Sequence, residues 1–365
     1  MSVPGITDWT DRLVRLGLGV QAQIVASLRK SAESGDFSGA VAVAEESGDR
    51  IYELDRAVEP ILLDAIRDWP RECFPLVLIA EGFGADGTLR FSEPGAEPLA
   101  AAAQSESDSD APARWRLIID PIDGTRQLMY DKRPGWFLAA VTPDRGHQTS
   151  LSDAVASVLA ELPTSRQSLA DVFFAESGQS TRGLRVDAGS DVSIDEGLQS
   201  ATPIPVRPSQ AVDLTDGFLT VVGCFPGTRR LAADLAERIA ERLAAVTALP
   251  QFFDDQYIST GGQMSQLMTG RDRCCIDLRP LFNRILGRSD EDRFVEVHPY
   301  DAAGLLAAQN AGVVVTDGFG RRLDAPLDVK TGLHWCGYAN TSIQQLIEPI
   351  VAEWLSDHGV TPDGD

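Results

Sequence analysis

The chain has 365 residues and a formal net charge of -22, with 43 % hydrophobic and 24 % charged residues. This length and apolar content suffice for a buried core without disulfide bonds, and they exclude a wholly disordered chain. The negative charge argues against a nucleic acid polymer as partner, because duplex binding needs a positive surface. It also repels phosphorylated metabolites, so a phosphate site here needs local cations, either basic side chains or bound metal.

Cysteine usage and the lack of targeting signals predict a cytoplasmic protein. The five cysteines form no CxxC pair and leave one over in any pairing scheme, which favours a reducing compartment. No export signal is recognisable at the N-terminus, and no apolar run approaches the ~18 residues of a membrane span. We therefore expect neither export nor a membrane anchor.

The first predicted elements, in chain order, are helices over 9–34 and 50–69. A short apolar run at 75–80 predicts a buried strand that stops at Glu81. Residues 94–113, rich in Ala, Ser and acidic residues, predict an exposed loop. A second strand is expected at 115–119, and it also ends in a carboxylate, Asp120.

The later part of the chain predicts a second α/β half. Residues 144–216 indicate strands and loops without a definable register, and a clear strand at 218–222 precedes a strong helix at 230–249. A helix is expected over 301–311, opening with Asp301. We predict an N-terminal part, 1–210, with Glu81 and the motif of residues 120–125, and a C-terminal part, 211–365, with Asp301, in one compact catalytic unit.

The most informative segment is Asp120-Pro121-Ile122-Asp123-Gly124-Thr125. It places two carboxylates three residues apart just past a strand, and Mg²⁺ prefers such oxygen ligands. The glycine lets the backbone approach a ligand, where successive amides can hold a phosphate oxygen. A lone Asp-Pro or Asp-Gly is typical of a turn, but six specific residues after a strand favour a site.

This hexapeptide resembles the first signature of the inositol monophosphatase superfamily, magnesium-dependent and lithium-sensitive phosphatases related to fructose-1,6-bisphosphatase. Three further segments resemble other parts of that pattern: Leu54–Glu59, Ile79–Gly82 and His298–Gly304. The resemblance covers roughly 50–130 and 255–330. It implies a layered αβαβα sandwich of the α/β (α+β) class, and it implies a homodimer.

The resemblance also implies a ligand set for two or three Mg²⁺ ions. Glu81, Asp120 and the carbonyl of Ile122 would bind the first ion, and Asp120, Asp123 and Asp301 the second. A third, weaker ion would lie near Glu81, where Gly82 replaces the second acid of many relatives.

Catalytic and phosphate-binding roles follow from the same resemblance. Thr125 would orient and deprotonate the attacking water with Glu81, while Asp55 would lie near the metals as a further catalytic residue. The amides of Gly124 and Thr125 would hold phosphate. The implied reaction is hydrolysis of a small phosphorylated metabolite (a sugar, polyol or nucleotide phosphate) by metal-activated water.

Substrate residues depart from the inositol-specific pattern. Phe294 occupies the position of the polyol-reading acid, and Tyr300 replaces the usual tryptophan. Arg126 adds a cation next to the phosphate motif and is a candidate contact to a second anionic group. Arg126 and Tyr300 are the candidate substrate residues, and inositol phosphate is not the expected preferred substrate.

Two alternatives remain open at this stage. Haloacid-dehalogenase-like phosphatases use an Asp-x-Asp-Gly-Thr motif with an aspartyl nucleophile, but here two residues separate Asp120 from Asp123. A catalytically weak or inactive protein that binds metal or ligand as a regulator would also retain these residues. Turnover of a generic phosphate ester with Mg²⁺ separates this alternative from an enzyme.

Overall fold

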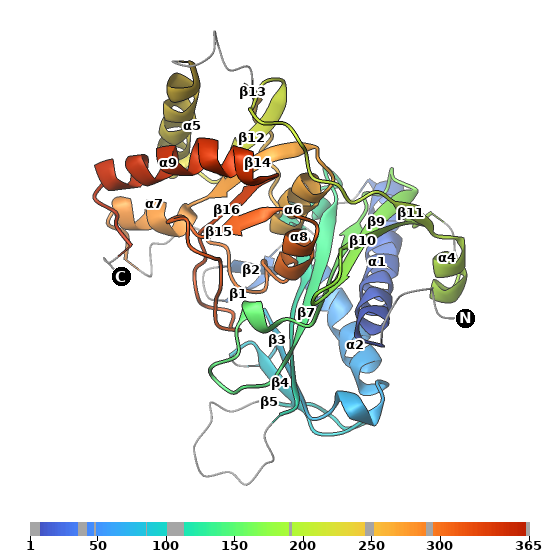
Figure 1. Ribbon diagram of the computed structural model, residues 1–365. Coiled ribbons are helices and arrows are strands. Elements are labelled where there is room, and N and C mark those ends of the chain that lie inside the picture. The colour runs from blue at the N-terminus through green and yellow to red at the C-terminus, as the bar shows by residue number, and fades with distance from the viewer. Residues whose placement is uncertain are drawn as a thin grey trace. The chain divides into compact units, whose positions relative to one another are not determined.

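The computed structural model describes residues 8–35, 42–46, 49–84, 86–100, 113–189, 192–244, 252–289 and 295–362. The chain divides into two compact units (Figure 1). The first comprises the described residues within Met1–Ile204, His298–Ala307 and Ala325–Thr331. The second comprises those within Pro205–Val297, Ala308–Asp324 and Gly332–Asp365.

The first unit is built on a nine-stranded sheet in the order β11-β10-β9-β8-β7-β6-β3-β4-β5. Strands β3 and β6 pair in parallel, and the other neighbours pair antiparallel. A separate hairpin joins β1 (Ala42–Glu46) to β2 (Asp49–Tyr52). The sheet strands are β3 (Leu76–Ala80), β4 (Thr88–Phe91), β5 (Leu99–Ala100), β6 (Trp115–Asp123), β7 (Gly135–Pro143), β8 (Ala156–Leu162), β9 (Leu169–Glu176), β10 (Arg182–Asp187) and β11 (Thr202–Ile204).

Helices α1 (Asp8–Ser34) and α2 (Glu53–Arg67) share a core with one face of this sheet. Helix α1 lies along β7, β8 and β9 (Figure 1), and Gly17 allows the close approach, since a Cβ there would lie 2.8 Å from Phe137. Alternate strand residues such as Leu117 and Ile119 point into this core. Because side chains alternate along a strand, Asp120 faces the opposite side of the sheet. The remaining helices of this part are α3 (Thr125–Met129) and α4 (Ile194–Ser200). Helix α8 (Leu305–Asn310) is divided, since Leu305–Ala307 belongs to the first unit and the rest of the helix to the second.

The second unit has a five-stranded sheet in the order β13-β12-β14-β16-β15. Helices α5 and α9 pack on each other and share a core with one sheet face, while α6 contacts β14 and β16 through the other, where Leu267 abuts Gly337. The strands are β12 (Gly217–Val221), β13 (Phe252–Phe253), β14 (Asp272–Asp277), β15 (Val314–Thr316) and β16 (Trp335–Tyr338), and the helices α5 (Arg229–Ala244), α6 (Thr260–Met268), α7 (Arg279–Ile285) and α9 (Thr341–Asp357).

The α+β class predicted from the sequence is confirmed, since helices cover large mixed sheets in the described chain. Some boundaries differ from expectation. The second helix begins at Glu53 rather than at residue 50, because Asp49–Tyr52 pairs in the β1–β2 hairpin. Most of the 94–113 loop lies outside the described residues. No helix in the described chain combines the length and apolarity needed to cross a bilayer.

Candidate metal centre

Asp120 and Asp123 occupy the end of β6, where the pairing with β7 is irregular. Asp120 pairs with Leu138 and Asp123 with Trp136, so three steps along β6 match two along β7. One extra residue in a strand is a β-bulge, and it reverses the alternation of side chains beyond it. Pro121, which lacks a backbone N–H, is tolerated at such a position. The bulge therefore turns both carboxylates to the same side of the sheet.

Asp301 reaches this region through close packing of its own segment on the sheet. A Cβ at Gly304 would lie 2.8 Å from Leu159 of β8, so glycine is required for the approach. Ala307 N donates to Ser157 Oγ (3.1 Å), and Thr181 Oγ1 donates to the Ala307 carbonyl (2.6 Å). These contacts fix the segment on β8 and at the start of β10.

The helix expected from Asp301 is not observed in this arrangement. The residue follows Pro299 in a run of turns, and the helix expected from 301 begins only at Leu305. Its carboxylate Oδ2 accepts a hydrogen bond from His298 N (2.6 Å), so it fixes a turn. Although Asp301 lies in the C-terminal part of the sequence, residues His298–Ala307 belong to the first unit.

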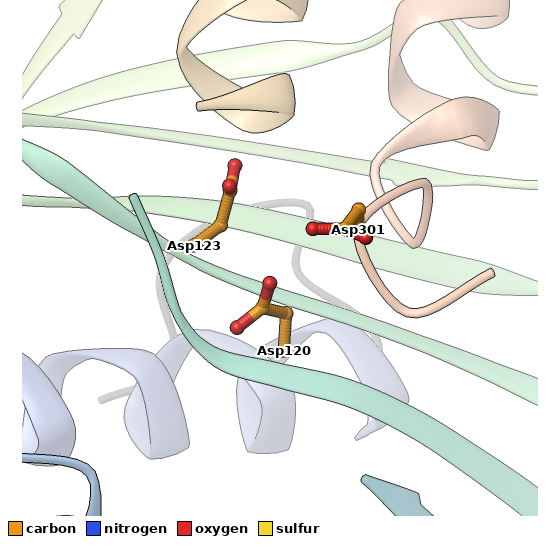
Figure 2. A group of neighbouring side chains, drawn as sticks. All are labelled: Asp120, Asp123 and Asp301. Carbon is orange, nitrogen blue, oxygen red and sulfur yellow. The ribbon is translucent and has the colours of Figure 1, made fainter. Parts of the chain in front are cut away.

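The three aspartates converge. One carboxylate oxygen from each of Asp120, Asp123 and Asp301 lies within 4.8 Å of the other two. Figure 2 shows the three side chains gathered in one region, two from the end of β6 and one from the turn before α8. Asp120 and Asp123 are only 8 % and 5 % exposed. Within the described chain, this is the one group of acidic, His or Cys side chains close enough to hold a metal ion.

The electrostatics of the cluster fit a hard divalent cation. Burial raises the pKa of Asp120 well above its usual range, and the charges of Asp123, Asp301 and Glu81 raise it further. Only the hydrogen bond from Ile122 N (3.0 Å) favours the ionised form. Crowded, buried carboxylates destabilise the folded protein by themselves, whereas Mg²⁺ binds through carboxylate oxygens and offsets their charge.

Glu81 lies beside the cluster through the parallel pairing of β3 and β6. Ala80 pairs with Ile119, which places the next residues, Glu81 and Asp120, side by side at the ends of their strands. The charge of Glu81 contributes to the raised pKa of Asp120. Glu81 does not belong to the tight group of three described above, and is therefore an outer carboxylate of the site.

Thr125 links the motif to helix α2. Its hydroxyl donates to the carbonyl of Ile122 (2.7 Å), and Asp55 Oδ1 lies 3.3 Å from the same oxygen. Gly124 has a left-handed backbone (φ 85°), which turns the chain from β6 directly into α3. The structure thus brings Asp55, Ile122 and Thr125 together next to the aspartates.

No protein-family profile and no curated protein matches this sequence. Solved structures do match. The extragenic suppressor protein suhB of Bartonella henselae has a TM-score of 0.57 at 16 % identity, covering 94 % of this chain and 98 % of its own. The IMPase of Thermotoga maritima has a TM-score of 0.55 at 16 % identity, with 97 % of this chain and 100 % of its own covered. The fructose-1,6-bisphosphatase of Leishmania major has a TM-score of 0.57 at 13 % identity, with 94 % of each chain covered. The chain has the inositol monophosphatase/fructose-1,6-bisphosphatase fold.

That fold agrees with the resemblance noted in the sequence, and it confirms the predicted fold class. Within it, Arg126 lies in α3 and is partly exposed. Tyr300 is only 4 % exposed and stacks on His298, with ring centroids 5.4 Å apart, so little of its ring is left for a substrate. Phe294 lies outside the described residues.

Sequence reasoning missed two backbone groups that orient the carboxylates on this fold. The amides of Ile122 and His298 donate to Asp120 and Asp301, respectively. The first contact spans two residues and is a familiar Asx-type pattern, so the Asp-Pro-Ile sequence carried a signal for it. In the second contact the amide of His298 donates to the side chain of Asp301, three residues later, within turns that contain Pro299. The sequence carries no comparable signal for this contact.

Proposed function

We propose that this protein is a cytoplasmic, Mg²⁺-dependent phosphomonoesterase that hydrolyses a small phosphorylated metabolite. The observation that carries the proposal is the convergence of Asp120, Asp123 and Asp301 within 4.8 Å. Supporting it, proteins of the same fold include an IMPase and a fructose-1,6-bisphosphatase. The net charge of -22 repels an anionic substrate, and cations bound at this site can attract it.

The three aspartates are the residues proposed to hold Mg²⁺, with Glu81 and the carbonyl of Ile122 as additional ligands for two or three ions. Bound at such a site, divalent cations lower the pKa of water and neutralise charge on the leaving oxygen. Asp120 is central to this arrangement because the pairing of β6 with both β3 and β7 fixes its backbone. The hydrogen bond from Ile122 N fixes its side chain.

Thr125 is proposed to position the attacking water through its hydroxyl. In the structure, Oγ1 donates to the Ile122 carbonyl and lies 3.3 Å from Asp55, so its single proton has two acceptors. A shift of that proton toward Asp55 Oδ1 leaves Thr125 Oγ1 as an acceptor for a water proton, with Glu81 as a second acceptor. The amides of Gly124 and Thr125, at the start of α3, are assigned to the phosphate oxygens.

Substrate choice is proposed to depend on a second anionic group. Arg126 directly follows the phosphate motif, and a charge-assisted contact from a guanidinium is among the stronger polar interactions. We therefore expect a sugar bisphosphate, a nucleotide bisphosphate or a phosphorylated acid to be preferred over inositol phosphate. Inositol phosphate as the best substrate of a panel would contradict this assignment.

Phosphate release from a panel of metabolite phosphates tests the function. We expect release with Mg²⁺, none after chelation, and loss of on the order of 10²-fold or more in kcat for Asp120→Asn, because an amide cannot replace the charge of a metal ligand. Asp195→Asn is the matched control, since its carboxylate is exposed and pairs with Arg15 at the surface. Release that is unaffected by chelation and by Asp120→Asn would overturn the proposal. Trapping of an aspartyl phosphate would favour a covalent mechanism instead.

A further inference from the structure

A hollow of about 440 Å³ lies in the first unit between helix α1, the end of β10 and helix α4. Figure 1 shows α1 and α4 as neighbours at this edge of the sheet, and residues of the two helices are in contact. The hollow lies on the face of the sheet that α1 covers, whereas Asp120 faces the other side. It is therefore separate from the candidate metal centre.

The floor of the hollow is apolar. It is formed by Leu18 and Val25 of α1 and by Val186 of β10, all of which are buried. Val192, which precedes α4, lies at the rim and is 47 % exposed. The volume of about 440 Å³ lies in the range of small-molecule pockets in proteins.

Two neighbouring cations, Arg29 and Lys30, line the same hollow. Arg29 Nη2 donates to the carbonyl of Ala188 (3.3 Å), which is a neutral acceptor. In the part of the chain that the structure describes, neither cation forms an ion pair, although the protein carries a net charge of -22. Among the described residues, the acids that line the hollow are Glu33 and Asp187. Asp187 already accepts a hydrogen bond from Gly189 N (2.7 Å).

We propose that this hollow binds a small amphipathic anion, with its apolar body on Leu18, Val25 and Val186 and its anionic head at Arg29 and Lys30. An apolar cavity with one cationic end selects such a molecule over a neutral one of the same shape. This site is independent of the proposed phosphatase function and requires no metal.

Two fluorescent probes test the inference directly. Anilinonaphthalene sulfonate and phenylnaphthylamine share one apolar body, and only the first carries a sulfonate. Both fluoresce when they leave water. We expect the sulfonate to bind the full-length protein more tightly by about tenfold, the size of one charge-assisted contact.

Substitutions on α1 locate the binding. Ala26 is exposed and lines the hollow, so Ala26→Trp should fill it and weaken both probes by at least about tenfold. Ala32→Trp is the matched control, because Ala32 is exposed on the same helix but does not line the hollow. Far-UV circular dichroism and unfolding curves check that both variants fold.

Removing a positive or a negative charge from the rim should change the affinity for the sulfonate in opposite directions. Arg29→Gln should weaken the sulfonate about tenfold and leave the neutral probe within about twofold, whereas Glu33→Gln should strengthen the sulfonate. Equal binding of either probe to wild type and Ala26→Trp would overturn the site. Equal affinity of both probes, unchanged by Arg29→Gln, would overturn its anion preference.

Discussion

Replacing Asp120 by asparagine is expected to stabilise the metal-free protein while abolishing its activity. One carboxylate oxygen from each of Asp120, Asp123 and Asp301 lies within 4.8 Å of the others. At that separation two unit charges repel by ~1 kcal/mol in bulk water and by ~3.5 kcal/mol at an effective dielectric constant of about 20. Asp120 has two such neighbours, so removing its charge should raise the free energy of unfolding by about 2 kcal/mol or more.

The pH dependence of this gain has a definite sign. Burial, followed by the neighbouring carboxylates, raises the pKa of Asp120 in the folded protein above that in the unfolded chain. Below about pH 4, the usual carboxyl pKa, the charge of Asp120 therefore makes no difference between the unfolding free energies of wild type and Asp120→Asn. As the pH rises above that value, the wild type loses stability relative to Asp120→Asn. The difference should be largest at alkaline pH.

Urea unfolding at several pH values, in chelator and in Mg²⁺, measures both effects. Saturating Mg²⁺ at about 100 times its Kd should stabilise wild type by about 2.7 kcal/mol through mass action and Asp120→Asn far less. Asp195→Asn, at an exposed carboxylate, should follow the wild type in both conditions. The reasoning fails if metal-free Asp120→Asn is less stable than wild type at pH 8, or if Mg²⁺ stabilises both proteins equally.

Three further predictions concern single side chains. Thr125→Ser should keep substantial turnover and Thr125→Ala should lose on the order of 10²-fold in kcat, as expected for lost proton-transfer help; equal rates of phosphate release would make the residue structural. Arg126→Ala should lower kcat/KM selectively for substrates with a second anionic group, and an equal loss for all substrates would refute that contact. Burial, then Asp255 and Asp254, raises the pKa of Asp272 to about 7. Wild type should therefore lose up to about 4 kcal/mol relative to Asp272→Asn as the pH rises from about 4 to about 7, and parallel unfolding curves across that range would contradict this.

The sequence predicted the local elements of the site well because their signals are local. The apolar runs before Glu81 and Asp120 lie in β3 and β6, and both strands carry these acids at or near their carboxyl ends. The parallel pairing that sets Glu81 beside Asp120 was not predicted, because strand pairing depends on residues far apart in sequence. The resemblance implied only that the two acids bind the same ion.

Features that depend on tertiary packing were not predictable. The bulge between Asp120 and Asp123 is a feature of the register with β7, and Gly304, just before α8, packs on Leu159 of a distant strand. The hollow beside α1 involves residues about 160 positions apart, such as Val25 and Val186, and no short motif marks it.

Binding of Mn²⁺, a hard cation that takes the same oxygen ligands as Mg²⁺, tests the metal centre most directly. Titration followed by electron paramagnetic resonance should show tight binding to wild type and to Asp195→Asn. Asn substitutions at Asp120, Asp123 or Asp301 should each weaken at least one site by about tenfold or more, because each removes a charged ligand. Undiminished binding by all three variants would show that these aspartates do not form a metal centre.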